Sequence, residues 1–278
     1  MRIAVVQTTY DGERPSVVEQ VDAVASWVGD HLRGEEIDLL VLPELWPVGA
    51  FRPRTWQERA EALDGPIVAA MAGLARSLDT VVHLGALIER AADDRLYNTA
   101  VVLGRDGDLL ATYRKIHRMR AGGLEAEILA PGTQIGVVDL PLRDGTTLRT
   151  GLATCYDLRF PELFRAMVDE GAEAFVVPAS WPQIRARAWE VLLRARAVED
   201  QALVVGASAV GTDGKTQMAG RSAVVDPAGT DLAVAGTGPG VLVVDVDLDE
   251  LRAARASFPV LNDRRIRVQP GALAGPDL

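Results

Sequence analysis

Short apolar runs alternate with amphipathic segments along this chain, and that alternation restricts the fold more than any other feature. Residues 3–7 and 39–42 are apolar runs suited to strands buried on both faces, and residues 17–32 between them repeat apolar side chains at helical spacing. This connection is long enough for a helical crossover, which favours parallel pairing of the two strands. A second unit of this kind spans residues 148–178. The units predict an α/β protein with helices packed outside one or two sheets.

The remaining predicted elements continue this pattern. Residues 65–78 and 186–199 are predicted as helices, and residues 117–133 have no clear period and are interpreted as an ordered loop. Asp106 and Gly107 lie between two apolar runs and are typical of a hairpin turn. Further strands are predicted at residues 81–88, 98–103, 109–113, 148–154, 175–178, 204–210, 221–225 and 241–246.

Composition narrows the possible functions. Of the 278 residues, 48% are hydrophobic and 24% are charged, as in ordinary globular proteins. The net charge of −10 argues against a nucleic-acid or membrane partner, because binding either needs a basic face. One cysteine cannot form an intrachain disulfide, and no apolar run approaches the length of a membrane span. We therefore expect a cytoplasmic protein.

The chain does not match the sequence motifs that bind metals or cofactors. The three histidines have no metal-like spacing, and a single cysteine offers no zinc site. No glycine-rich dinucleotide fingerprint follows a strand. Residues 211–216 end like a phosphate-binding loop but lack its earlier glycine, so a hairpin turn is the better interpretation. The sequence predicts no metal and no cofactor.

The single cysteine, Cys155, lies between a predicted strand and a predicted helix. Pro161 and Glu162 suit the first turn of that helix, where a missing N–H is harmless and a negative charge meets the positive end of the dipole. A cysteine in such a turn presents its sulfur at the carboxyl edge of a sheet, where backbone N–H groups can stabilise a thiolate or an oxyanion. Because a lone cysteine is more often a small buried hydrophobic residue, its neighbours in the fold decide its role.

Two more reactive side chains leave the ends of predicted strands. Glu44 and Lys115 each follow an apolar run, and parallel sheets gather their ligands outside the carboxyl ends of the strands. We therefore expect Glu44, Lys115 and Cys155 to converge. A nucleophilic cysteine needs a base and an oxyanion stabiliser, which a glutamate and a lysine can supply. His117 points the same way as Lys115 and is a further candidate for the site.

These residues stand in contexts that resemble the nitrilase superfamily of carbon–nitrogen hydrolases, which carry a Glu–Lys–Cys triad. The matching segments are Leu-Pro-Glu44, Tyr-Arg-Lys115-Ile-His and Cys155-Tyr-Asp-Leu-Arg-Phe-Pro-Glu-Leu, in the order that the family shows. Glu125, in the stretch Glu-Ala-Glu-Ile-Leu-Ala-Pro-Gly, takes the position of a second active-site glutamate of the family. The three boxes together make the resemblance specific.

The resemblance implies both a fold and a reaction. It covers residues 1–268, for which it implies a single carbon–nitrogen hydrolase domain, and residues 269–278 are then a C-terminal tail. The implied fold is a four-layer α-β-β-α sandwich, with two stacked mixed sheets flanked by helices. The superfamily normally pairs this sandwich into a dimer, so we expect a homodimer. Its members hydrolyse non-peptide C–N bonds, which makes a small-molecule amide the expected substrate.

Roles follow for each residue that matches the family. Glu44 is expected to take the thiol proton of Cys155, whose thiolate attacks the amide carbon. Lys115 and the backbone N–H of Tyr156 are expected to stabilise the oxyanion, and release of ammonia leaves a thioester for water to hydrolyse. Glu125 is expected to hold Lys115 and the substrate in position. Burial raises the pKa of Glu44 and Lys115 lowers it, and the sequence leaves that balance open.

Several neighbouring residues have two interpretations. Ser180 and Trp181 follow another predicted strand and either line the pocket or anchor a loop through a packed indole. His117 is included with them as a substrate-binding candidate. Asp157 and Arg159 are expected to brace the turn after the cysteine through an ion pair, with substrate contact as the alternative.

The segment that begins at Cys155 looks most like the branch of omega-amidases and deaminated-glutathione amidases. That resemblance implies hydrolysis of the terminal amide of a small dicarboxylic acid or its oxo-acid relative, such as 2-oxoglutaramate. The chain departs from the branch at Asp200, where asparagine usually precedes Gln201. Arg185 and Arg187 either attract an anionic substrate or form a solvated helix face.

Other activities use the same three residues. An N-carbamoyl amidohydrolase is the main alternative, followed by a nitrilase and by an acyltransferase that passes the thioester to an amine. A redox-sensing Cys155 without turnover is a further alternative. It would not explain a glutamate and a lysine at neighbouring strand ends.

Overall fold

Two six-stranded sheets form the centre of the molecule in the computed structural model, which describes residues 1–10, 16–120 and 124–266. The first sheet has the order β14 (Gly240–Asp245), β1 (Arg2–Gln7), β2 (Leu39–Val41), β3 (Val81–Arg90), β4 (Leu96–Leu103) and β5 (Leu109–Arg114). The second sheet has the order β13 (Asp231–Val234), β12 (Ala223–Val225), β9 (Leu203–Ser208), β8 (Ala174–Ala179), β7 (Thr147–Leu152) and β6 (Gly136–Pro141). Both sheets are mixed: β1, β2 and β3 are parallel neighbours in one, and β7, β8 and β9 in the other.

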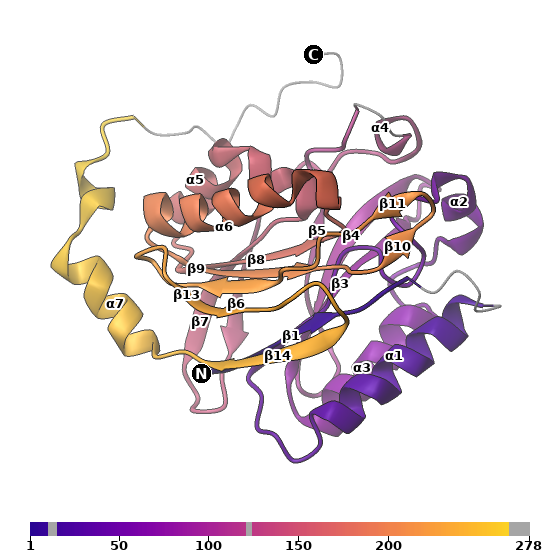
Figure 1. Cartoon of the computed structure of the whole chain (residues 1–278), viewed down its shortest axis with the longest axis horizontal. Helices are drawn as coiled ribbons and strands as arrows, with labels where there is room; N and C mark the ends of the chain where they lie inside the picture. Colours follow the sequence, from indigo (N-terminus) through magenta and orange to yellow (C-terminus); the bar gives the residue numbers. More distant parts are fainter. Residues whose placement is uncertain (11–15, 121–123, 267–278) are drawn as a thin grey trace.

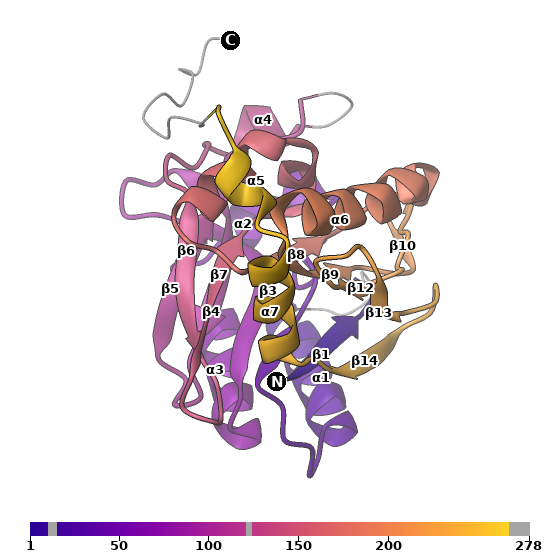
Figure 2. The same ribbon diagram turned by 90° about the vertical axis from the view of Figure 1, so that its left-hand side faces the viewer.

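Helices cover the outer faces of both sheets (Figure 1). The pair α1 (Val17–His31) and α3 (Pro66–Leu78) lies on the far side of the first sheet from the pair α5 (Pro161–Asp169) and α6 (Ala186–Asp200), which covers the second. Figure 2 shows the same layers after a quarter turn, with α7 (Leu248–Ser257) running along one side of them. The shorter helices are α2 (Trp56–Arg59) and α4 (Glu125–Ile128). The predicted α-β-β-α sandwich is confirmed.

The residues of β1 illustrate how the sequence produces this layering. Ile3 and Val5 face the core between the two sheets, whereas Ala4 and Val6 face the core beneath α1 and α3. Successive strand residues point to opposite faces, so a strand covered on both sides must be apolar at every position. The helix that follows, α1, is capped by Ser16, whose Oγ accepts a hydrogen bond from the Glu19 N–H at 3.1 Å.

Both predicted hairpins are present. The turn between β4 and β5 contains Gly107 at a φ of +82°, a conformation that glycine adopts without strain. The stretch interpreted as a hairpin instead of a phosphate loop forms β10 (Thr212–Asp213) and β11 (Thr216–Gln217), an antiparallel pair. Within the segment interpreted as a loop, the structure adds the short helix α4.

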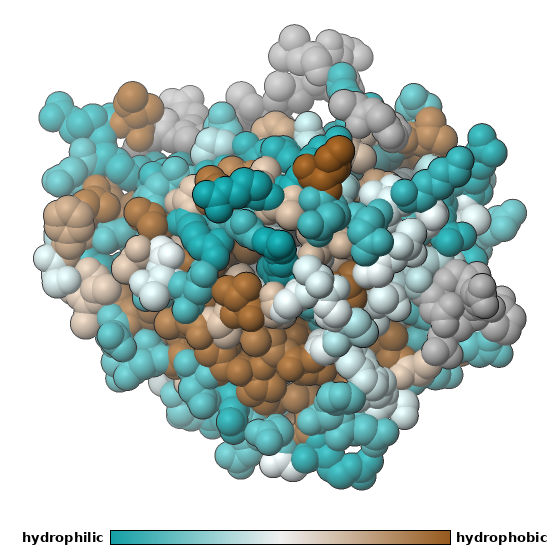
Figure 3. Space-filling model, viewed as in Figure 1, coloured by the Kyte–Doolittle hydropathy of each residue, from teal (hydrophilic) through white to brown (hydrophobic). Residues whose placement is uncertain are grey.

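The edge strands β6 and β13 were not predicted. Each pairs with one neighbour only, and each mixes apolar residues with exposed polar ones, so neither forms a buried apolar run. Figure 3 shows an apolar area over the edges of β13 and β14, to which the exposed side chains of Leu232, Val234 and Val243 contribute. No helix in the described ranges is long and apolar enough to cross a membrane. The tail expected at residues 269–278 lies outside the described residues.

Candidate active site

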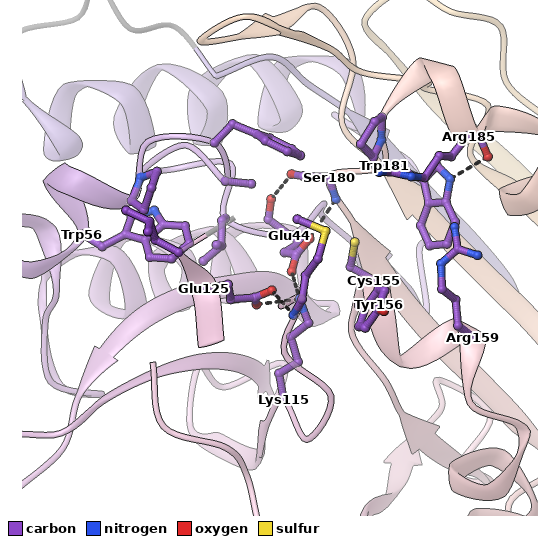
Figure 4. Close-up of a pocket in the computed structure, with 17 residues that line it drawn as sticks. Glu44, Trp56, Lys115, Glu125, Cys155, Tyr156, Arg159, Ser180, Trp181 and Arg185 are labelled. Atoms are coloured by element: carbon purple, nitrogen blue, oxygen red, sulfur yellow. Dashed lines mark hydrogen bonds and ion pairs between the residues drawn. The ribbon is translucent and has the colours of Figure 1, made fainter. Parts of the chain in front are cut away.

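Strands of both sheets end at one pocket of about 520 Å³ (Figure 4). Glu44 and Lys115 approach it from the first sheet and Cys155 from the second, while Glu125 comes from α4. The four residues therefore converge, and the strand ends predicted this for Glu44, Lys115 and Cys155. The lining residues are Glu44, Leu45, Ala50, Phe51, Pro53, Trp56, Lys115, Met119, Leu124, Glu125, Cys155, Tyr156, Arg159, Ser180, Trp181, Pro182 and Arg185.

Cys155 occupies a sharp turn between β7 and α5. Its φ of +47° lies in the left-handed region, which is sparsely populated by residues other than glycine and is often found at functional sites. Cys155 begins a 3₁₀-helix (Cys155–Arg159), and Pro161 is the first residue of α5, as predicted. The N–H groups of the first turn of a helix have no intrahelical acceptor, and Tyr156 is in this first turn.

Glu44 lies just beyond β2, where its backbone forms a bridge to Ala86 of β3. Gly85 makes this close approach possible, because a Cβ atom there would lie 1.8 Å from the carbonyl oxygen of Pro43. The carboxylate Oε2 accepts a hydrogen bond from the Ser180 N–H at 3.0 Å, and Ser180 Oγ donates to the Glu44 carbonyl at 2.7 Å. These two bonds connect the first sheet to the second directly at the pocket.

Lys115 lies between two carboxylates. Its Nζ is 2.9 Å from Glu44 Oε1 and 2.7 Å from Glu125 Oε1. None of the three residues is more than 6% exposed. Glu125 Oε2 also accepts a hydrogen bond from the Met119 N–H at 2.8 Å. One buried ammonium thus compensates two buried carboxylates, with hydrogen bonds that satisfy their other oxygens.

Asn98 is a residue of this cluster that the sequence analysis missed. Its Nδ2 donates to Glu44 Oε1 at 2.8 Å and lies 3.4 Å from Glu125 Oε1, so it joins the two carboxylates from β4. The only signal in the sequence was a polar side chain at the start of an otherwise apolar strand. That pattern alone does not distinguish a site residue from an exposed strand end.

The pKa shifts define the protonation states in the cluster. Burial acts to raise the pKa of Glu44, but the charge of Lys115 and hydrogen bonds from Lys115, Cys155 and Ser180 outweigh it, so the pKa lies below its ordinary value. Burial and the nearby charge of Glu44 raise the pKa of Cys155 well above its usual range. Burial opposes the charge on Lys115, yet Glu125 and Glu44 hold its pKa well above the ordinary value. At neutral pH the cluster contains a carboxylate, an ammonium and a neutral thiol.

Ser180 and Trp181 line the pocket and are also structural anchors. The Trp181 indole is almost completely buried, and its Nε1 donates to the carbonyl of Arg185 at 2.8 Å. The guanidinium of Arg159 lies 4.8 Å from the centre of the Trp181 ring. Ser180 and Trp181 therefore fit both interpretations: they line the pocket, and they also anchor the loop that follows their strand.

The expected ion pair between Asp157 and Arg159 is wrong. Asp157 is completely buried and accepts hydrogen bonds from Tyr113, His117 and Thr154, while Arg159 lies over the indole at the pocket. The reason is that the turn after Cys155 directs these two side chains to different partners.

His117 was predicted to bind substrate, but it does not line the pocket. Its Nδ1 is 2.8 Å from Asp157 Oδ1, and its ring stacks on Phe160 with a centroid separation of 3.8 Å. The strand register correctly placed it near Lys115. The buried carboxylate of Asp157 and the Phe160 ring hold the imidazole away from the pocket.

The two arginines near the start of α6 differ in their environments. Arg185 lines the pocket, whereas Arg187 has 85% of its side chain exposed and lies 3.6 Å from Glu190. Asp200, the departure from the omega-amidase branch, is buried and does not line the pocket. Its side chain lies 3.2 Å from Arg165.

A thiol beside a carboxylate base, with an ammonium opposite, is suited to acyl transfer. The carboxylate can take the thiol proton, and the ammonium can stabilise the oxygen that becomes negatively charged when the sulfur adds to a carbonyl. Both charges come from protein side chains that are hydrogen-bonded to each other at 2.9 Å.

Known proteins resemble the chain along its length. The carbon–nitrogen hydrolase family matches residues 2–256. A 2-oxoglutaramate amidase from Paenarthrobacter nicotinovorans is 38% identical over 269 residues, which cover 95% of this chain and 89% of that protein. An omega-amidase from Homo sapiens is 35% identical, covering 82% of this chain and 83% of that protein.

A solved structure shares the fold over nearly all of both chains. XC1258 from Xanthomonas campestris, described as a CN-hydrolase superfamily protein with an arsenic adduct in the active site, superposes with a TM-score of 0.86. Its sequence is 29% identical, and the match covers 97% of this chain and 98% of that one. The chain belongs to the carbon–nitrogen hydrolase family of the nitrilase superfamily and is an amidase that hydrolyses small amide C–N bonds.

Proposed function

We propose that the chain hydrolyses the terminal amide of a small carboxylic acid, with Cys155 as the nucleophile. The observation that carries this proposal is the meeting of Glu44, Lys115 and Cys155 in a pocket that Arg159 and Arg185 also line. The first three residues supply the chemistry of amide cleavage, and the two guanidinium groups suit a substrate carboxylate. The names of the relatives from Paenarthrobacter nicotinovorans and Homo sapiens support a substrate of this class.

In the first half of the proposed reaction, Glu44 takes the proton of the Cys155 thiol as the sulfur attacks the amide carbon. The carbonyl oxygen becomes an oxyanion, which Lys115 Nζ and the N–H of Tyr156 stabilise. The C–N bond then breaks, the Glu44 proton passes to the leaving nitrogen, and ammonia departs. A thioester on Cys155 remains, and the Glu44 carboxylate is restored.

In the second half, Glu44 takes a proton from water as the water oxygen attacks the thioester carbon. The same two donors stabilise the second oxyanion. The C–S bond breaks, the proton passes from Glu44 to the sulfur, and the carboxylic acid leaves. Glu125 keeps Lys115 in place throughout, since its Oε1 lies 2.7 Å from the ammonium.

The lowered pKa of Glu44 supports its role as the base, because a base must be ionised before it can accept a proton. The raised pKa of Cys155 makes that base necessary, since little thiolate forms at neutral pH without it. The balance that the sequence left open therefore favours proton transfer during attack over a preformed thiolate.

Ammonia release from a panel of amides tests the proposal. The panel contains 2-oxoglutaramate, succinamate, glutamine, an N-carbamoyl amino acid and the uncharged propionamide, each with wild-type protein and with Cys155→Ala. We expect release from an amide that carries a carboxylate, and none from the variant. Propionamide as the best substrate would contradict the proposed carboxylate recognition. Release that persists in the variant would contradict the proposed nucleophile.

Arg185 and Arg187 provide a matched pair for the specificity claim. Arg185→Gln should raise KM for the carboxylated amide about tenfold, since a charge-assisted hydrogen bond is lost. It should leave propionamide unchanged. Arg187→Gln removes the same charge two residues away, outside the pocket lining, and should change neither substrate. Equal effects of the two variants would indicate general electrostatic attraction.

We also propose that the protein is a cytoplasmic homodimer, with a small molecule as its partner instead of nucleic acid or a membrane. A reducing compartment keeps Cys155 as a thiol. Val191 and Val198 on α6 are about half exposed, at 46% and 50%, which suits pairing of this helix layer with a second copy. Light scattering during size-exclusion chromatography tests this, and Val198→Glu should shift a dimer toward monomer. A wild-type monomer would contradict it.

A further inference from the structure

A buried carboxylate outside the proposed reaction joins the two halves of the site. Asp157 is completely buried and follows Cys155 by two positions. It belongs to the turn after β7 of the second sheet, yet two of its partners flank the end of β5 in the first sheet. Burial of a charge is costly unless hydrogen bonds satisfy it, so the partners of Asp157 show what it holds.

Four donors surround this carboxylate. Oδ2 accepts hydrogen bonds from Tyr113 Oη at 2.8 Å and from the Thr154 N–H at 3.0 Å. Oδ1 accepts from the His117 N–H at 2.9 Å and lies 2.8 Å from His117 Nδ1, which must carry a hydrogen to face a carboxylate. Both oxygens are therefore satisfied by two donors each.

These donors are close in sequence to two reacting residues. Tyr113 and His117 are two positions before and two positions after Lys115, and Thr154 immediately precedes Cys155. The phenol of Tyr113 also accepts a hydrogen bond from the Ile116 N–H at 3.3 Å, so the chain around Lys115 is held at Tyr113, Ile116 and His117. One carboxylate thus connects the backbone that carries the ammonium to the backbone that carries the thiol.

We propose that Asp157 is a positioning residue that fixes the Lys115 ammonium relative to the Cys155 sulfur, through Tyr113, His117 and Thr154. Lys115 and Cys155 belong to different sheets, and the layer between the sheets is apolar. Apolar packing is non-directional and sets no precise distance between two polar atoms. Directional hydrogen bonds at the edge of that layer do set it, and a displacement of about 1 Å at a catalytic group can cost on the order of 10²-fold in rate.

The imidazole of His117 is part of this arrangement. It stacks on Phe160 with an angle of 6° between the rings, and Phe160 immediately precedes the first residue of α5. The stack sets the plane of the imidazole, and the plane directs Nδ1 toward Asp157. His117 therefore acts through Asp157 on the cluster, without contact with the substrate.

The inference rests on the proposed function, and its test compares Asp157→Asn with Asp38→Asn. Asp38 is also buried, at 8% exposure, and accepts hydrogen bonds from the N–H groups of Arg2 and Arg143, but it does not line the pocket. In Asp157→Asn, the side-chain oxygen can still accept hydrogen bonds. The new NH₂ group, however, would face two groups that are themselves donors. Tyr113→Phe is the second test variant, and Tyr97→Phe on the neighbouring strand β4 is its control.

Three readouts are measured for each variant: kcat and KM for the best amide of the panel, the pH profile of Cys155 alkylation by 2-chloroacetamide, and Tm. For Asp157→Asn we expect kcat to fall roughly 10- to 100-fold with KM within threefold of wild type. The alkylation profile should move to higher pH, because Lys115 lowers the pKa of Cys155 only when its charge is held nearby. Tyr113→Phe should show both changes, each at least about a third as large as in Asp157→Asn. The controls Asp38→Asn and Tyr97→Phe should show neither change.

Wild-type kcat and an unchanged alkylation profile in Tyr113→Phe would overturn the inference. Equal changes in Asp38→Asn would overturn it too, since they would reflect stability in general. If Asp157→Asn does not fold, Tyr113→Phe and its control decide the outcome alone. Alkylation requires no amide turnover, so a shifted profile in a protein that hydrolyses none of the amides would contradict the proposed function and leave the positioning role standing.

Discussion

The two sheets supply different kinds of chemistry to the pocket. The first sheet ends in charged residues, Glu44 and Lys115, which lie 2.9 Å apart and are almost completely buried. The second sheet ends in Cys155 and Ser180, which carry no charge at neutral pH and shape the turn and the wall of the pocket. Removing a charge from the first side therefore disturbs both catalysis and folding, whereas removing the thiol from the second disturbs catalysis alone.

The largest expected effect belongs to the second sheet. Cys155→Ala should lower the rate of amide hydrolysis by about 10⁴-fold or more, because the chain contains no other thiol. Its Tm should stay within a few degrees of wild type, because only a small side chain is lost. A large fall in Tm would contradict the assignment of stability to the first sheet.

Lys115→Met distinguishes the role of the first sheet from that of the second more sharply, because it should lower both the rate and the stability. Loss of the ammonium removes an oxyanion donor, worth about 10²- to 10³-fold in rate. It also leaves Glu44 and Glu125 buried without a counter-charge, which should cost about 3–5 kcal/mol of unfolding free energy. Urea denaturation with wild-type and Cys155→Ala proteins in parallel measures this difference. Equal unfolding free energies for the three proteins would contradict the comparison.

The backbone of the first sheet can be tested without touching a charge. Gly85→Ala places a Cβ atom 1.8 Å from the Pro43 oxygen and should displace Glu44, with a rate loss of about 100-fold. Gly145 has the same positive φ, +83° against +82°, but its Cβ would meet no heavy atom within 4 Å. Gly145→Ala therefore carries only the backbone strain, about 1–2 kcal/mol, and should keep full activity. Equal activities would show that the Gly85 contact does not position Glu44.

Asp200, on the helix side of the second sheet, should have the smallest effect on activity. Its carboxylate is buried at the carboxyl end of α6. Arg165 lies 3.2 Å from Oδ1, but neither oxygen accepts a hydrogen bond of good geometry within the described ranges. Burial raises its pKa to about 7 from the ordinary 3.8, so the folded protein binds more protons than the unfolded chain between those values. The unfolding free energy should thus fall as pH rises from about 4 to 7, by at most about 4 kcal/mol from this group.

Asp200→Asn should remove that slope while leaving activity unchanged at neutral pH. Urea denaturation at pH 5 and pH 8 measures the difference, with the half-exposed Asp139→Asn as a control. A slope that remains in Asp200→Asn would assign the pH dependence to another group. Activity lost in this variant at neutral pH would connect the departure from the omega-amidase branch to the pocket after all.

The strand ends predicted that Glu44, Lys115 and Cys155 converge, and the alternation of strands and helices predicted helices outside one or two sheets. The four-layer sandwich and the place of Glu125 followed from the family resemblance. The sequence could not predict the partners of Asp157 or His117, since these depend on side-chain directions in a turn of five residues. Neighbouring charges in the sequence suggested an ion pair that the turn does not form. A buried carboxylate finds its donors through tertiary contacts, and those contacts link segments about 40 residues apart.

The same limit applies to Asn98 and to the edge strand β6. A single amide at the start of a strand acquires its role only when Glu44 and Glu125 are brought to it from distant segments. The strand β6 is half exposed, and its pairing with β7 compensates for a weak apolar pattern. Strands buried on both faces were predicted from their composition, and so were the edge strands β5 and β14, whereas the edge strands β6 and β13 were not.

Mass spectrometry of the intact protein during turnover tests the central claim most directly, which is that Cys155 forms a thioester with the acyl part of the amide. A Glu44→Gln variant should slow both halves of the reaction and allow the adduct to accumulate from an activated ester of the same acid. We expect a mass increase equal to one acyl group, located on Cys155 by peptide mapping and absent from Cys155→Ala. An adduct on another residue, or amide hydrolysis by Cys155→Ala at the wild-type rate, would contradict the account.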